Sequence, residues 1–263
     1  MAADRHLLEA RAAGEGPPLV LLNGYAATKD DWDPGFVAAL ARSSSVLMPD
    51  NRGIGASPGP VDGLDVASMA DDVLALMDAR GITRTDLAGW SMGGFIAQEV
   101  AARAPERVRR LVLLSTDHGG PASVRADPAT WRALTDHGGT PREQATRLLG
   151  LLFPPELAAQ LDAQVGDLVA QARAVLQEGT LDAQERAMEQ WHSGPADARL
   201  TAITAPVLVA AGTQDVVIPP ENSRLLAAAL GDARLELFDG GGHAFMAQDP
   251  ERLAALIGDA LGR

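Results

Sequence analysis

A serine set among glycines is the first feature of this sequence that could do chemistry. Residues 89–94 read Gly-Trp-Ser-Met-Gly-Gly, between a short apolar run and an apolar segment with the period of a helix. A nucleophile elbow requires this strand–turn–helix context, because the sharp turn strains its central residue and admits only glycine where backbones approach closely. The N-terminus of the helix would also favour negative charge at the serine oxygen. A serine that lies among glycines by chance would not also lie between a strand and a helix, so we predict that Ser91 is a nucleophile.

An aspartate and a histidine downstream could complete the chemistry of Ser91. A serine hydroxyl is a weak nucleophile and needs a base, which an acid in turn orients. Asp215 follows the apolar run 207–210, and His243 follows the run 235–238 through a segment of glycines. Ligands of open α/β sheets bind at the carboxyl ends of strands, where all three residues would lie. The chain order serine, aspartate, histidine fits this architecture, so the three residues together predict nucleophilic catalysis.

The elements that would position these residues alternate along the chain. Short apolar runs alternate with segments of helical period, which is the pattern of βα units around a parallel sheet. An antiparallel edge strand is expected over His6–Ala12. Further strands are expected over 19–22, 46–48, 87–88, 111–114, 207–210 and 235–238. Helices are expected over 32–41, 68–79, 92–104, 221–230 and 250–261.

Residues 119–200 interrupt this alternation. They hold amphipathic stretches separated by Gly-Pro or Pro-Pro signals and no strand-like run; the stretches are 128–137, 141–153, 155–178 and 181–192. So long a strandless excursion is usually functional. We predict a helical lid inserted into a core of residues 1–118 and 201–263, the alternative being extra helices packed on the sheet. Because lids close apolar pockets over small ligands, we expect Trp131, Phe153 and Trp191 to face the substrate.

Composition narrows the classes of function. The net charge of −13 argues against a nucleic-acid surface, and no apolar run approaches the roughly 18 residues of a membrane span. The absence of cysteine and of an apolar N-terminal signal region suits the cytoplasm. No spacing typical of metal ligands occurs. We therefore expect a cytoplasmic protein that acts on a small molecule without a metal, a cofactor, a nucleic-acid partner or a membrane; the oligomeric state stays open.

These motifs together resemble the α/β-hydrolase superfamily, in particular its small lid-bearing esterases, lactonases and haloperoxidase-like enzymes. The resemblance covers essentially the whole chain outside the expected lid. It includes residues 50–57, Asp-Asn-Arg-Gly-Ile-Gly-Ala-Ser, which resemble the family's Asp-x-Arg-Gly-x-Gly-x-Ser loop. We expect this loop to brace the fold rather than to react. The fold that the resemblance implies is an α/β-hydrolase fold: a mostly parallel sheet with helices on both faces and an inserted helical lid.

The resemblance also assigns roles in a site without cofactor. His243 matches the family's base and Asp215 its acid. The backbone N–H of Met92, the residue after the nucleophile, matches one donor of the oxyanion hole. The second donor matches Tyr25, which follows Asn23-Gly24 where the family usually has His-Gly. The replacement by Asn23 affects a side chain that supports the loop and leaves the donor in place.

A rival pair of residues follows another strand. Asp117 and His118 come after the expected strand 111–114, and some members of the family place the acid there. The other histidines, at positions 6, 137 and 192, lie away from the ends of the expected strands. Asp117 therefore stays an alternative to Asp215.

The implied function is that of a serine hydrolase, which cleaves a small carboxylic ester-like substrate through an acyl-enzyme. Cofactor-free haloperoxidases or perhydrolases, lactonases, C–C hydrolases and lyases share the triad. The serine at the elbow argues against haloalkane dehalogenases and epoxide hydrolases, which use aspartate. An alternative from a different class is a ligand-binding receptor built on the same scaffold.

Overall fold

The computed structural model describes residues 7–230 and 232–263, and its strands form one sheet in the order β1-β3-β2-β4-β5-β6-β7. All neighbouring pairs are parallel except β1 with β3. The predicted α/β fold with a mostly parallel sheet is confirmed. The strands are β1 (Ala10–Ala13), β2 (Pro18–Leu22), β3 (Ser45–Pro49), β4 (Thr85–Trp90), β5 (Val108–Leu114), β6 (Val207–Gly212) and β7 (Ala233–Phe238).

The edge strand is shorter than expected at its start. The prediction was His6–Ala12, whereas β1 begins at Ala10 and ends at Ala13; His6 lies outside the described residues. The backbone N–H of Glu9 donates to Ser57 Oγ (2.9 Å) instead of to a neighbouring strand. The Glu9 carbonyl accepts from the Asp50 N–H (2.9 Å) and Leu8 is buried in the core, so one backbone bond beside β3 and packing together fix this part of the chain.

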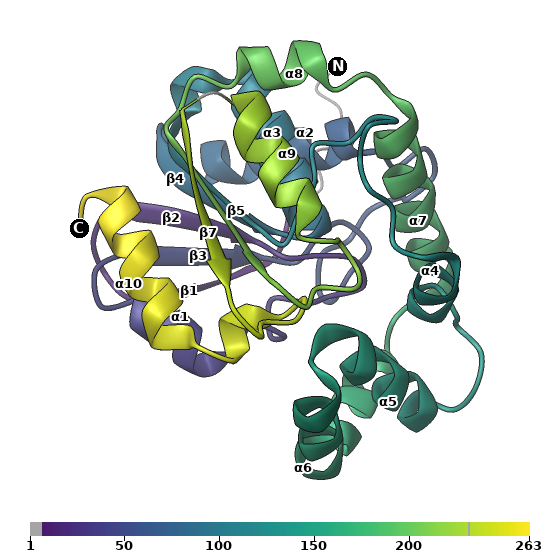
Figure 1. Ribbon diagram of the computed structural model, residues 1–263. Helices are drawn as coiled ribbons and strands as arrows, with labels where there is room; N and C mark the ends of the chain where they lie inside the picture. Colours follow the sequence, from purple (N-terminus) through teal and green to yellow (C-terminus); the bar gives the residue numbers. More distant parts are fainter. Residues whose placement is uncertain (1–6, 231) are drawn as a thin grey trace.

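Helices cover both faces of the sheet (Figure 1). Helices α1 (Pro34–Leu40) and α10 (Pro250–Leu261) lie on one face, and α2 (Val66–Ala79), α3 (Met92–Arg103) and α9 (Glu221–Leu230) lie on the other. Side chains alternate across each strand, so Leu19 and Leu21 pack on the side of α1 and α10. Val20 and Leu22 pack on the opposite side with α2 and α3. The central strands are thus buried on both faces, as parallel strands require.

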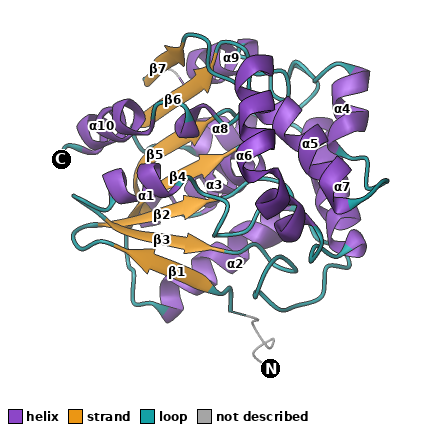
Figure 2. Cartoon of the chain, turned by 90° about the horizontal axis from the view of Figure 1, so that it is seen from below, coloured by secondary structure: helices purple, strands orange, loops and turns teal. Residues whose placement is uncertain are grey.

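A helical insertion separates β5 from β6. It contains α4 (Pro128–Leu134), α5 (Pro141–Leu152), α6 (Pro155–Arg173) and α7 (Glu178–Ser193), and α8 (Asp197–Ala202) follows. Figure 2 shows α4 to α7 beyond the end of the sheet toward which the parallel strands point. The short 3-10 helices η1 (Pro105–Arg107) and η2 (Phe245–Ala247) lie outside the insertion.

The insertion differs from the sequence prediction mainly in where one long helix is broken and in one additional helix. A helix was expected over 155–178, but α6 ends at Arg173 and α7 begins at Glu178. Residues 174–177 carry no glycine or proline to mark the break; the chain turns where Leu176 packs beside Ala26 and Ile54. Helix α8 was not predicted. Among the helices of the described residues, none has both the length and the apolar character that a membrane crossing requires.

Candidate active site

Ser91 lies in a strained turn between β4 and α3. Its backbone has φ 56° and ψ −125°, a conformation that residues with a side chain rarely adopt. Close packing imposes it, because a Cβ on Gly89 would lie 2.2 Å from the carbonyl oxygen of Gly93. The Ser91 N–H donates to the Leu114 carbonyl (2.9 Å), and its own carbonyl accepts from Thr116 Oγ1 (2.8 Å). The strand–turn–helix context expected for Ser91 is therefore present.

Asp215 and His243 form a buried pair. Oδ2 of Asp215 lies 2.8 Å from Nδ1 of His243, and Oδ1 accepts from the N–H groups of Val217 and Ile218 (both 2.9 Å). An ionised carboxylate only accepts hydrogen bonds, so Nδ1 carries the proton of the neutral imidazole. Nε2 makes no hydrogen bond to any described residue and is left as the basic nitrogen.

The loop that carries His243 is packed tightly against the end of β6. A Cβ on Gly212 would lie 2.2 Å from the carbonyl oxygen of Gly241, so only glycine fits at this strand end. Trp90, the residue before Ser91, donates from Nε1 to the His243 carbonyl (2.9 Å). The N–H of Ala244 donates to the carbonyl of Leu152, the last residue of α5 (3.0 Å). Strand β4 and the insertion thus both fix the position of the imidazole.

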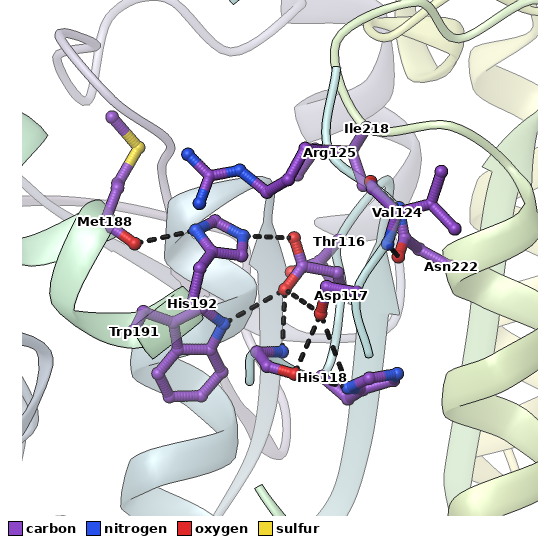
Figure 3. A network of polar contacts seen from close by, with 12 residues as sticks. Thr116, Asp117, His118, Val124, Arg125, Met188, Trp191, His192, Ile218 and Asn222 are labelled. Atoms are coloured by element: carbon purple, nitrogen blue, oxygen red, sulfur yellow. Dashed lines mark hydrogen bonds and ion pairs between the residues drawn. The ribbon is translucent and has the colours of Figure 1, made fainter. Parts of the chain in front are cut away.

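Asp117, the rival acid, has different partners (Figure 3). Its Oδ2 lies 3.0 Å from Nε2 of His192, and its Oδ1 accepts from the Gly119 N–H (2.7 Å) and from Trp191 Nε1 (3.1 Å). His118 instead directs Nδ1 at the Gly119 carbonyl (2.6 Å). Burial alone would raise the pKa of Asp117, but the hydrogen bonds, above all that from His192, outweigh burial and lower the pKa from its ordinary value. The structure pairs Asp117 with neither His118 nor His243.

Each ring nitrogen of His192 lies next to an acceptor. Its Nδ1 lies 2.7 Å from the Met188 carbonyl and its Nε2 faces the carboxylate of Asp117. The imidazole therefore bridges the helix α7 backbone and the Asp117 carboxylate through its two nitrogens. The side chain of Asp117 is 3% exposed and that of His192 is 10% exposed. This buried contact joins α7 of the insertion to the segment after β5.

The two expected oxyanion donors are both unpaired. Neither the N–H of Met92 nor that of Tyr25 donates to a described residue, and Met92 opens α3, where the first N–H groups lack helical partners. A Cβ on Gly24 would lie 3.1 Å from the Ser91 Cβ, so the loop touches the serine just before Tyr25. Asn23 closes this loop as expected: it accepts from the Gly24 N–H (3.0 Å) and donates from Nδ2 to the Thr28 carbonyl (2.5 Å).

Helix α7 anchors the same loop. The Tyr25 hydroxyl donates to Glu185 Oε1 (2.5 Å) and lies 3.2 Å from Nε2 of His137. The N–H of Ala26, whose φ is 56°, donates to the buried Oε1 of Gln184 (2.9 Å). Burial, reinforced by Glu185, raises the pKa of Tyr25, so its hydroxyl remains a donor. The conformation of the loop therefore depends on side chains of the insertion.

The one group of potential metal ligands among the described residues belongs to this anchor. It consists of His137, Asp182 and Glu185, whose ligand atoms lie within 4.8 Å of one another. Nε2 of His137 and Oε1 of Glu185 already lie 2.8 Å apart and both contact Tyr25. We interpret the group as a hydrogen-bonded support for the loop.

Ser91 and His243 border one cavity of about 790 Å³. The Ser91 hydroxyl makes no hydrogen bond to a described residue and is open to this space. Trp131 and Phe153 also border the cavity. Helices α5 and α6 supply an apolar part of its wall, formed by Leu148, Leu149, Leu152, Leu157, Leu161, Val165, Leu168 and Val169.

Trp191 corrects the sequence prediction, because it is not part of the cavity wall. Its ring stacks on Phe95 at 4.9 Å between centroids, and the Arg199 guanidinium lies 3.5 Å from the ring centroid. Met188 and His192 are the residues of α7 that border the cavity. Trp191 faces the core, where its Nε1–H donates a hydrogen bond to Asp117 Oδ1.

Sequence reasoning also missed most of the cavity wall. The apolar residues of α6 recur every three or four positions, which is the spacing of one helix face. That signal was available in the sequence, but it does not say whether the face meets the sheet or a cavity. The arginines at positions 125 and 173, which also border the cavity, had no motif to mark them.

Comparison with known proteins identifies the family. A family model described as the alpha/beta hydrolase fold matches residues 17–250. The chain belongs to this family and is a hydrolase of the α/β fold. A protein of Variovorax paradoxus (strain S110) named "Putative carbamate hydrolase RutD" is 34% identical over 239 residues, which are 90% of this chain and 88% of that protein.

Two solved structures have the same fold over nearly the whole chain. A hydrolase from Pseudomonas aeruginosa PA01 is 30% identical, with a TM-score of 0.81, covering 97% of this chain and 94% of that chain. The enol-lactonase from Burkholderia xenovorans LB400 is 26% identical, with a TM-score of 0.82, covering 97% of this chain and 96% of that chain. The resemblance inferred from the motifs is thereby confirmed at the level of the family.

Proposed function

We propose that this protein is a serine hydrolase that cleaves a carboxylic ester-like bond by acyl transfer. Ser91 is the nucleophile, His243 the general base and Asp215 the acid that orients it. The observation that carries the proposal is the buried Asp215–His243 pair, 2.8 Å apart, on the cavity that the strained Ser91 also borders.

The reaction follows from where each group lies. His243 takes the hydroxyl proton of Ser91 on Nε2 while the serine oxygen attacks the carbonyl carbon of the substrate. The N–H groups of Met92 and Tyr25 stabilise the negative oxygen of the tetrahedral intermediate. His243 then protonates the departing alcohol, which leaves an acyl-enzyme. Water activated by the same imidazole releases the acid, and Asp215 stabilises the imidazolium throughout.

The named relatives support a carbonyl substrate and add a second candidate bond. A carbamate and an enol lactone both carry a carbonyl joined to a heteroatom, so the same two-step acyl transfer would open either one. The structural match to the enol-lactonase makes a lactone the second candidate substrate beside an open ester.

The insertion is the part of the chain that we assign to substrate selection. Its helices α5 and α6 supply the apolar wall of the cavity, opposite the strand ends that carry Ser91 and His243. Within this proposal residues 119–200 form the lid, and residues 1–118 and 201–263 form the hydrolase core.

An activity-based probe tests the function directly. A fluorophosphonate is expected to label Ser91 stoichiometrically, and a panel of esters, lactones and thioesters is expected to reveal turnover by the same preparation. Labelling without turnover would favour the receptor scaffold, and absence of both would refute the hydrolase proposal. Peptide mapping of the labelled protein identifies the modified residue.

Loss of the Tyr25 hydroxyl tests how the oxyanion loop is held. We expect Tyr25→Phe to lower kcat for p-nitrophenyl acetate by about three- to tenfold, since one hydrogen bond contributes about 1 kcal/mol and the loop donor acts in the transition state. KM is expected to change less. Glu185→Gln should lower kcat in the same direction, as steady-state kinetics will measure.

Glu178→Gln is the matched control for that pair of variants. Glu178 is exposed on the same helix and has no hydrogen bond to a described residue, so its replacement is expected to leave kcat unchanged. A rise in KM alone for Tyr25→Phe would mean that the hydroxyl contacts substrate and does not position the loop.

A further inference from the structure

Nearly all charged side chains that border the cavity are already satisfied by the protein. Asp30 forms an ion pair with Arg11 (3.1 Å), and Arg125 forms one with Glu189 (2.5 Å). Asp31 accepts from the Thr28 N–H and Asp33 from the Phe36 N–H. The remaining acids and histidines of the wall form the two buried pairs described above.

Arg173 is the exception among the charged cavity-lining residues that the structure describes. It is the last residue of α6 and is half-buried, yet its guanidinium has no hydrogen bond or ion pair with any described residue. Its Nε is inaccessible to solvent and lacks an acceptor. The two Nη groups also make no hydrogen bond to a described residue, and Arg173 borders the cavity, so these groups are available to a ligand there.

No residue that the structure describes around Arg173 accepts a hydrogen bond from it. Asp31 and Tyr25 are close enough to interact with its charge, but neither accepts a hydrogen bond from it. Arg173 remains a cation at neutral pH in a chain whose net charge is −13. Arg125, the other arginine of the wall, is neutralised by Glu189 and lies over the Trp131 ring at 5.4 Å.

The chemistry of the free group defines its ligand. A planar guanidinium with several donors matches the two oxygens of a carboxylate. We propose that Arg173 binds a carboxylate of the substrate, so that the preferred substrates are ester-like derivatives of dicarboxylic acids. The scissile carbonyl lies at Ser91, the free carboxylate lies at Arg173, and an apolar spacer contacts α5 and α6. This inference rests on the proposed function of the same cavity.

A binding measurement tests the carboxylate site without relying on turnover. Ser91→Ala protein is titrated calorimetrically with the monomethyl esters of succinic, glutaric, adipic and suberic acids. Each is compared with the neutral compound in which an amide replaces the free carboxylate. We expect the acid to bind about ten- to a hundredfold more tightly than its amide at the best chain length, which is the range for hydrogen bonds to charged groups.

Two arginine variants in the same background localise the effect. Arg173→Gln is expected to abolish the preference for the acid. Arg186→Gln, which removes an exposed arginine of α7 outside the cavity, is expected to retain it. Equal binding of acid and amide at every chain length overturns the proposal, as does a preference that survives Arg173→Gln.

A turnover measurement on the enzymes with Ser91 intact separates this inference from the proposed function. The ratio of kcat/KM for acid over amide should fall about ten- to a hundredfold in Arg173→Gln. Binding of the acid through Arg173 without turnover of any ester would retain the carboxylate site and refute the hydrolase. Turnover of both compounds with a ratio indifferent to Arg173 would retain the hydrolase and refute the carboxylate site.

Discussion

Replacing Ser91 with alanine is expected to lower turnover of p-nitrophenyl acetate by at least about 10⁴-fold. Removal of the nucleophile of a triad costs about as much as removal of the whole triad, because the base and acid have nothing left to activate. The substitution removes only Oγ and keeps Cβ, so the backbone strain at φ 56° stays the same. The thermal unfolding temperature should therefore move by no more than a few degrees. Steady-state kinetics and calorimetry measure the two quantities.

The control for this variant is a serine outside the cavity. Ser43 is exposed after α1, and Ser43→Ala is expected to retain wild-type kcat. Turnover by Ser91→Ala within tenfold of wild type would show that another group attacks the substrate, and the assignment of the triad would then be wrong.

The second large effect distinguishes the two buried acids, Asp215 and Asp117, because replacing one should lower activity and replacing the other should lower stability. Asp215→Asn is expected to lower kcat by about 10²- to 10⁴-fold, because an amide favours the wrong tautomer of His243 and leaves the imidazolium without its counter-charge. Asp117→Asn is expected to lower kcat far less. It should instead lower the free energy of unfolding by about 3 kcal/mol, since it removes the buried carboxylate that His192 and Trp191 contact.

The stability effect of Asp117 carries a pH dependence of defined sign. Its pKa in the folded protein lies below the ordinary value of 3.8. Stability from such a group is complete above the ordinary pKa and is lost as the pH falls through the lower folded pKa. The difference in free energy of unfolding between wild type and Asp117→Asn should therefore shrink as the pH falls below about 4. Urea denaturation at several pH values measures it. A larger kcat loss for Asp117→Asn than for Asp215→Asn would mean that Asp117, after β5, is the acid that orients the catalytic base.

The sequence predicted the fold well because its signals were local. Apolar runs set the strands, and caps such as Asp249 before Pro250 set the helix starts; the Asp249 side chain accepts from the Arg252 N–H as a cap should. The glycines around Ser91 predicted a turn whose close contacts admit no side chain. Each of these features depends on residues a few positions apart.

The features of the site that could not be predicted from the sequence depend on contacts between distant segments. Asp117 and Asp215 both follow strands, and only the path of α7, which brings His192 to Asp117, shows which histidine each acid meets. Trp191 and His192 are adjacent in sequence, yet one faces the core and the other the cavity. The guanidinium of Arg173 is free because no described acid near it in space accepts a hydrogen bond from it, which a linear pattern does not encode.

The anchoring of the oxyanion loop by α7 has a consequence for engineering. The His243 loop meets the insertion through the backbone carbonyl of Leu152, which any grafted helix would provide. The Tyr25 loop meets it through the side chains of Gln184 and Glu185, which a foreign helix would replace. Chimeras that exchange the whole insertion for that of a relative should therefore change the catalytic rate as well as selectivity. Chimeras that exchange α5 and α6 while keeping α7 should transfer selectivity alone.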